Sequence, residues 1–139
     1  MTAMIEPRQL RRHFSKAAAG YTAAADIQAG IASDLASRLQ PSAGTRILDV
    51  GAGSGVLASG LCCRGADVIA LDAAWGMVCA GRCSVPAAAW VQADAMALPF
   101  VSCNFDMVVS SSAYQWVDDL ARAFGEARRV LRPGGRFTA

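Results

Sequence analysis

The stretch Ile47-Leu48-Asp49-Val50-Gly51-Ala52-Gly53-Ser54-Gly55 decides the fold of this chain. Thr45 to Val50 reads as a short strand of buried character, and Val56 to Arg64 reads as a helix. Between them, alternating glycines let the backbone turn sharply and let a ligand approach without a Cβ in its way. The helix that follows presents free N–H groups and a positive dipole end. The stretch therefore predicts a ligand-binding loop between a strand and a helix.

The details of this loop indicate which ligand it binds. A dinucleotide-binding loop has the pattern Gly-x-Gly-x-x-Gly, which requires glycine where this chain has Val56. Asp49 precedes the glycines, and its negative charge would repel a pyrophosphate. A carboxylate there suits a ligand with a positive end, such as the ammonium group of a methionine moiety. We therefore reject the dehydrogenase interpretation.

Outward from this loop, strand and helix patterns alternate. The predicted strands are 45–50, 67–71, 88–93, 104–110 and 136–138. The predicted helices are 56–64, 73–83 and 118–131, the last with Phe124, Val130 and Leu131 on its apolar side and followed by a turn over 132–135. The first forty residues look helical, and the apolar face of their second helix is predicted to hold Ile27, Ile31, Leu35 and Leu39. This alternation predicts an α/β fold with a parallel sheet.

Two more aspartates follow the second and third predicted strands. Asp72 is placed to accept hydrogen bonds from ribose hydroxyls, although an aspartate at this junction also commonly begins a helix. Asp94 could accept the amino proton of an adenine lined by Ala95 and Met96, or it could be a turn aspartate. Because Asp49, Asp72 and Asp94 end successive strands, we expect all three at one edge of the sheet.

Composition excludes several classes of protein. The 139 residues allow one domain with a real core, and a net charge of +2 does not indicate nucleic acid as a partner. No apolar run approaches the roughly 18 residues of a membrane span, and no secretory signal is visible, so we expect a cytoplasmic protein without a membrane partner. Five cysteines without a Cys-x-x-Cys pair predict neither a disulfide framework nor a metal site, but buried thiols.

Together these motifs resemble the class I S-adenosylmethionine-dependent methyltransferases. The resemblance rests on residues 47–55, Asp72, 94–100 (DAMALPF), 105–111 (FDMVVSS) and 130–135 (VLRPGG), and it runs from about Thr45 to the C-terminus. It implies a Rossmann-like α/β fold, a mostly parallel sheet with helices on both faces, and S-adenosyl-L-methionine as cofactor. The cofactor-binding residues that it implies are Asp49, Gly51, Gly53, Gly55, Asp72, Ala73, Met77, Asp94, Ala95 and Ser110.

A narrower resemblance concerns the methyl acceptor. Residues 13–21 (HFSKAAAGY) and 110–116 (SSSAYQW) are similar to segments of the malonyl-carrier-protein O-methyltransferases of biotin synthesis. This implies methyl transfer to the free carboxylate of malonyl on an acyl-carrier protein. The chain departs from that family at Ser111, usually asparagine, and over 73–77 (AAWGM). Small-molecule C- or O-methyltransferases of the ubiquinone type share nearly all the core motifs and remain an alternative.

No residue is marked out as a catalytic base. A sulfonium methyl is already electrophilic and a malonyl carboxylate needs no base, so the enzyme chiefly aligns the two. The candidates for closing the site over the methyl group are Tyr21, Gln28, Tyr114, Gln115 and Trp116, and His13 is a weaker candidate.

Members of the family extend beyond the fifth strand, whereas this chain stops at Ala139. We therefore expect one domain over 1–139, with a helical cap segment over 1–40 and a cofactor-binding core over 45–139 that lacks the C-terminal strands. An inactive cofactor-binding fragment is a further alternative to an enzyme. The open edge of the last strand predicts self-association.

Overall fold

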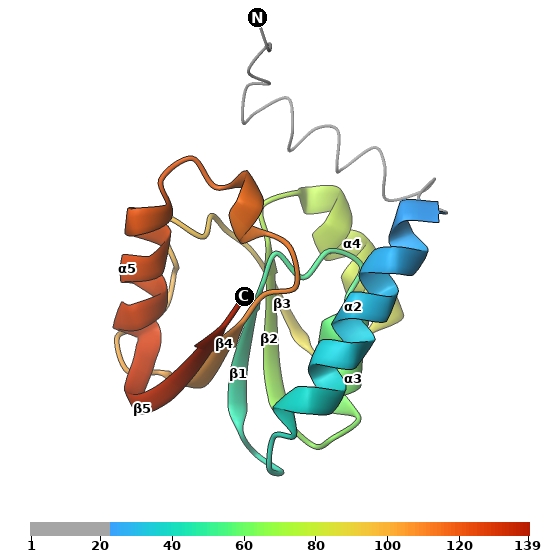
Figure 1. The fold of residues 1–139 in the computed structure, drawn as a ribbon, viewed down its shortest axis with the longest axis horizontal. Coiled ribbons are helices and arrows are strands. Elements are labelled where there is room, and N and C mark those ends of the chain that lie inside the picture. Colours follow the sequence, from blue (N-terminus) through green and yellow to red (C-terminus); the bar gives the residue numbers. More distant parts are fainter. Residues whose placement is uncertain (1–22) are drawn as a thin grey trace, which may run out of the picture.

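The computed structural model describes residues 23–139, and in this range helices and strands alternate as predicted (Figure 1). The candidate site residues His13 and Tyr21 lie outside the described residues. In chain order the elements are α2 (Ala23–Leu39), β1 (Arg46–Val50), α3 (Val56–Cys62), β2 (Asp67–Asp72), α4 (Trp75–Ser84), β3 (Ala89–Gln92), β4 (Phe105–Val109), the short 3-10 helix η1 (Tyr114–Trp116), α5 (Leu120–Val130) and β5 (Leu131–Thr138).

The five strands form one sheet in which every pair is parallel, in the order β3-β2-β1-β4-β5. β1 is central, and in its register Asp49 lies between Ala70 of β2 and Val109 of β4. From β1 the chain adds β2 and β3 on one side and then β4 and β5 on the other. The strand order therefore reverses between β1 and β4, and ligands of such sheets bind at the carboxyl ends of the strands beside this reversal.

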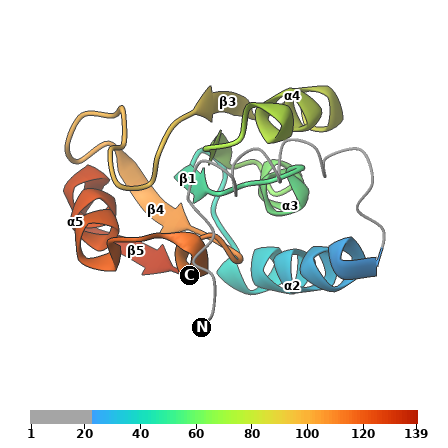
Figure 2. The same cartoon turned by 90° about the horizontal axis from the view of Figure 1, so that it is seen from above.

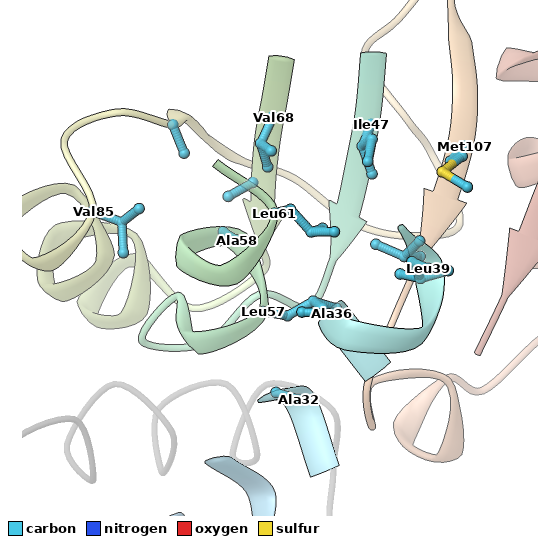
Figure 3. Packing of buried hydrophobic residues seen from close by; sticks show 13 residues of the cluster. Ala32, Ala36, Leu39, Ile47, Leu57, Ala58, Leu61, Val68, Val85 and Met107 are labelled. Carbon is cyan, nitrogen blue, oxygen red and sulfur yellow. The ribbon is translucent and has the colours of Figure 1, made fainter. Parts of the chain in front are cut away.

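Helices cover both faces of the sheet, with α2 and α3 on one side and α5 on the other (Figure 2). Because successive residues of a strand point to opposite faces, β1 contributes to two separate cores. Ile47 packs in the cluster with α2 and α3, which also contains Leu57 and Leu61 (Figure 3). Leu48 packs in the second cluster with α5. The predicted Rossmann-like α/β fold is therefore confirmed.

The buried face of α2 differs from the predicted one. Its buried residues are Ala32, Ala36 and Leu39. Of the predicted apolar face, Leu39 is buried and Leu35 packs against the core, whereas Ile27 and Ile31 are 69% and 52% exposed. Small residues prevail because α2 lies very close to α3: a Cβ added to Gly60 of α3 would lie 2.8 Å from the Cβ of Ala36. Isoleucine would not fit at such a contact.

The end of α5 and the start of β5 also differ from the prediction. Leu131 was expected in the helix but pairs with Phe105 as the first residue of β5. The predicted turn over 132–135 becomes an irregularity within the strand, because the next pair in register is Met107 with Arg136. Extra residues on one strand of a pair bend it and increase its twist. The predicted strand 136–138 is confirmed.

On the predicted apolar side of α5, Val130 is buried, and Phe124 is 45% exposed but stacks on the ring of Tyr114. The prediction about the cysteines was wrong. The cysteines were expected to be buried, yet Cys63, Cys79, Cys83 and Cys103 are exposed and Cys62 is half-buried. The cysteines lie on helix surfaces and in turns, and the hydrophobicity of the thiol alone does not predict these positions. No helix in the described range 23–139 has the length and apolar character to cross a membrane.

Candidate functional site

The glycine-rich loop lies at the carboxyl end of β1, beside the point where the strand order reverses. Its first turn is held against β2, because the backbone N–H groups of Gly51 and Ala52 both donate to the carbonyl oxygen of Leu71, at 2.7 and 2.9 Å. The loop then closes on itself through a hydrogen bond from Gly55 N–H to the oxygen of Ala52. The loop is therefore a fixed structure between β1 and α3.

The three glycines of the loop have positive φ angles but serve different purposes. A Cβ on Gly51 would overlap the Cβ of Ala113, which follows β4. A Cβ on Gly55 would lie 2.9 Å from both the Trp90 ring and Val85. Only at Gly53, with φ of 57°, would a Cβ meet no atom within 4 Å. The expectation that the glycines leave room for a ligand therefore applies geometrically to Gly53, whereas Gly51 and Gly55 make room for neighbouring segments.

Asp49 is buried next to this loop without a hydrogen-bond partner. Its side chain points to the face of the sheet that α3 covers, and the residue is only 1% exposed. Neither carboxylate oxygen has a partner of hydrogen-bond geometry. Burial, together with the nearby negative charge of Asp72, raises the pKa of Asp49 to about 7, and the N–H of Ala58 opposes this only partly. A group with a positive charge would stabilise the ionised carboxylate.

Asp72, at the end of β2, connects the loop to the start of α4. One of its carboxylate oxygens accepts the N–H of Gly53 at 2.9 Å, and the other accepts the N–H of Ala74 at 2.8 Å. Burial raises its pKa, while the N–H groups of Ala74, Gly53 and Ala73 oppose the rise. The side chain thus orders both the loop and the first turn of α4. An ionised carboxylate has about four acceptor sites, so it could also accept ribose hydroxyls.

Asp94 follows β3 and forms a turn, which was one of its two predicted roles. Its carboxylate accepts the N–H of Met96 at 2.9 Å, and its carbonyl oxygen accepts the N–H of Ala97 at 3.0 Å. The turn places Ala95 and Met96, both half-buried, directly after the carboxyl end of β3. On the side of α4, Ala73 is half-buried and Met77 is buried.

Ser110 holds the segment that follows β4. The residue is buried, its N–H donates to the oxygen of Thr138, and its hydroxyl accepts the N–H of Ala113 at 3.2 Å. This turn brings Ala113 against Gly51. The segment over 110–116 and the glycine-rich loop are therefore in direct contact.

The candidates for closing the site are only partly brought together. Gln115 and Trp116 are exposed on η1, close in the chain to Ala113, and Gln115 donates to the oxygen of Ser112. Gln28 is exposed on α2. Tyr114 is instead a packing residue: its ring stacks on Phe124 at 5.4 Å between centroids, its hydroxyl is buried without a partner, and burial raises the pKa of Tyr114 to about 12.

Sequence reasoning missed Trp90 and Ala113, which shape the loop from outside. Trp90 stands on β3, and its ring lies against both Gly55 and Gly81. One signal was present, because an isolated glycine such as Gly81 within a helical pattern often has a packing reason. Nothing in the sequence marked Ala113. Within residues 23–139, no group of three or more metal-binding side chains is found.

The comparisons with known proteins agree with this fold. The family described as "Methyltransferase domain" matches residues 48–139, which include the glycine-rich loop and all five strands except the first residues of β1. The five-stranded parallel sheet with helices on both faces matches the Rossmann-like class I methyltransferase fold. The chain belongs to this methyltransferase domain family.

Individual relatives have more specific descriptions. A biotin biosynthesis bifunctional protein of Cellvibrio japonicus is 40% identical over 134 residues, covering 95% of this chain and 27% of that protein. A malonyl-[acyl-carrier protein] O-methyltransferase of Geobacter sulfurreducens is 40% identical over 144 residues, covering 96% of this chain and 53% of that protein. The chain thus spans about half the length of this second relative.

A solved structure supports the same fold. Phosphoethanolamine N-methyltransferase 2 of Haemonchus contortus, solved in complex with S-adenosyl-L-methionine, superposes with a TM-score of 0.66 at 27% identity. The match covers 70% of this chain and 24% of that chain.

Proposed function

We propose that this chain binds S-adenosyl-L-methionine and takes part in methyl transfer to the free carboxylate of malonyl on an acyl-carrier protein. The observation that carries the proposal is the carboxylate of Asp49, which is buried and unpartnered beside the glycine-rich loop. An unpaired buried charge is costly unless an opposite charge joins it. The ammonium group of the methionine moiety is such a charge.

The residues around Asp49 fit the rest of the cofactor. Gly53 faces open space at the loop, so its backbone can be approached closely. Asp72 would accept the ribose hydroxyls while it keeps its bonds to Gly53 and Ala74. Asp94, Ala95 and Met96 would receive the adenine, and Gly51, Gly55, Ala73, Met77 and Ser110 complete the proposed set. The proposed site therefore has acceptors for the ammonium group, the ribose hydroxyls and the adenine amino group of the cofactor.

When bound, the cofactor supplies a methyl group made electrophilic by the adjacent sulfonium. The residues of the chain need only hold this group in line with the acceptor, because alignment alone accounts for a large part of the acceleration of such reactions. We propose that η1, with Gln115 and Trp116, borders the acceptor side, since the preceding residue Ala113 contacts Gly51. The identity of the acceptor is supported by the relatives described as malonyl-[acyl-carrier protein] O-methyltransferases.

Two measurements test the two parts of the proposal separately. Calorimetric titration should show binding of S-adenosylhomocysteine, and no comparable binding of NAD. Tighter binding of NAD would contradict the cofactor assignment. Transfer of a labelled methyl group should occur to malonyl-carrier protein and not to acetyl-carrier protein, which lacks the free carboxylate. Cofactor binding without any transfer would identify the chain as a binding fragment and contradict the second part alone.

A further inference from the structure

The indole of Trp90 fills the space between the glycine-rich loop and α4. A Cβ on Gly55 would lie 2.9 Å from Cζ2 of the ring, and a Cβ on Gly81 of α4 would overlap the ring. The indole N–H donates to the carbonyl oxygen of Val85 at 3.1 Å, just after the end of α4. The ring is therefore fixed by a hydrogen bond and can lie this deep only because both neighbours lack a side chain.

Gly55 is a sensitive point for such a contact. It is the residue from which α3 starts, its φ is 94°, and it is buried. Its position sets the direction of the first turn of α3, where the N–H of Ala58 faces the carboxylate of Asp49. The other end of the loop is already held by β2 and by Ala113. Trp90 is the matching support at the α3 end.

From this geometry we infer that Trp90 is a positioning residue of the proposed cofactor site. The inference rests on the proposed function: Trp90 would act through Gly55, by holding this residue and the start of α3 in place beside Asp49. In catalysis, a misplacement of about 1 Å caused by a distant mutation can cost about a hundredfold in rate, and the contacts of a bound cofactor depend on placement in the same way. Loss of the indole should therefore weaken cofactor binding and not only the stability of the core.

The experiment compares two ways of removing the support with one matched control. Trp90→Ala deletes the ring, and Gly81→Ala keeps tryptophan but forces the ring out of its present position between Gly81 and Gly55. Gly60→Ala is the control, because it also introduces a clash in a helix, with Ala36, yet it lies away from Trp90. For each variant, the dissociation constant of S-adenosylhomocysteine and the free energy of unfolding in urea are measured. Trp90→Phe is added in case Trp90→Ala does not fold.

We expect the dissociation constant to rise by about tenfold or more in Trp90→Ala and in Gly81→Ala. The double variant should bind no more weakly than Trp90→Ala alone, because both changes remove the same contact. Gly60→Ala should lose stability while its dissociation constant stays close to that of the parent chain. If Trp90→Ala and Gly81→Ala lose stability but bind as the parent does, Trp90 only packs the core and the inference is wrong.

A second readout separates this inference from the proposed function. Should the parent chain not bind S-adenosylhomocysteine, the proposed function fails, and hydrogen exchange then decides the role of Trp90. Once exchange is corrected for the difference in global stability, the amides of 53–58 should exchange faster in Gly81→Ala than in Gly60→Ala. Only Gly81→Ala disturbs the contact between Trp90 and the loop. Equal exchange in the two would overturn the positioning role.

Discussion

At the scale of single residues, Asp49 links the stability of the chain to its site. Burial disfavours the ionised form of the Asp49 carboxylate, and so does the nearby negative charge of Asp72. Together they raise the pKa of Asp49 to about 7. A group whose pKa is raised by folding contributes its full stability below its unfolded pKa, near 4. That contribution is lost as the pH rises from about 4 through about 7. The residue thus weakens the ligand-free chain at neutral pH.

Replacement of Asp49 by asparagine tests this linkage. Asp49→Asn should be more stable than the parent chain at pH 8, by on the order of a few kcal/mol, and equal to it near pH 4. Urea unfolding at both pH values measures the difference in the free energy of unfolding between the variant and the parent chain. Asp106 and Glu126 contribute in the opposite direction, because their arginine and backbone partners lower their pKa values. Since both proteins contain these two residues, their contributions cancel in the difference. The same variant should bind S-adenosylhomocysteine more weakly. A stability difference independent of pH would contradict the account.

Gly53 provides a second test at this scale. Gly53→Val should abolish cofactor binding while the fold is largely kept, because the added side chain enters the open space at the loop. Gly44→Val is the matched control: Gly44 also has a positive φ and no atom near a Cβ, but it lies in the turn before β1. Both variants place valine at a positive φ, 57° at Gly53 and 79° at Gly44. Calorimetry should show loss of binding only in Gly53→Val, and equal binding by both would mean that Gly53 is merely a turn residue.

At the scale of elements, α5 is fastened to the segment that follows Asp94. Arg129 donates to the carbonyl oxygens of Phe100 and Leu98, and Glu126 accepts the N–H of Leu98 while it pairs with Arg129 at 2.7 Å. These bonds hold the segment over 95–100, which contains two of the proposed adenine contacts, against the helix. The position of the segment over 95–100 therefore depends on α5.

The corresponding prediction concerns Arg129→Ala. We expect a loss of about 1–3 kcal/mol in the free energy of unfolding, because two buried or half-buried carbonyl groups lose their donor and Glu126 loses its partner. Arg128→Ala, at the exposed neighbouring position, should change it by less than about 0.5 kcal/mol. Urea denaturation of both variants makes the comparison. Equal effects would show that the contacts contribute nothing specific.

The elements also show what the sequence could and could not predict. The parallel sheet and the acids at the strand ends follow from local pattern, because alternation and chain direction leave few alternatives. The order of the strands was not predicted. The buried face of α2 does not follow from local pattern, since close helix packing selected Ala32 and Ala36 over the more hydrophobic Ile27 and Ile31. The support of Gly55 by Trp90 is likewise a contact between distant segments, and no local pattern encodes it.

At the scale of the whole molecule, β5 forms one edge of the sheet in the described residues. It pairs with β4 on one side, and its outer side carries N–H and C=O groups that could pair with another chain. Phe124 and Phe137, 45% and 39% exposed, pack together beside this edge at 5.6 Å between ring centroids. Apolar surface next to an open strand favours association.

We therefore expect the chain to self-associate as its concentration rises. Light scattering over a dilution series should show growth of the average mass, and Phe137→Lys should reduce it. Val101→Lys, which changes an exposed residue in the loop before β4, should not. A monodisperse monomer at high concentration would contradict the expectation.

The contact between Gly51 and Ala113 has a consequence for how this sequence can evolve. The Cβ of an alanine at position 51 would overlap the Cβ of Ala113, so this substitution is not tolerated while residue 113 is alanine. With glycine at position 113 the overlap disappears, and only the strain of a positive φ remains, about 1–2 kcal/mol. The effect of one substitution thus depends on the other, and the two sites are epistatic. Substitutions in the glycine-rich loop are therefore constrained by the segment after β4, and the two positions should change in a fixed order, position 113 first.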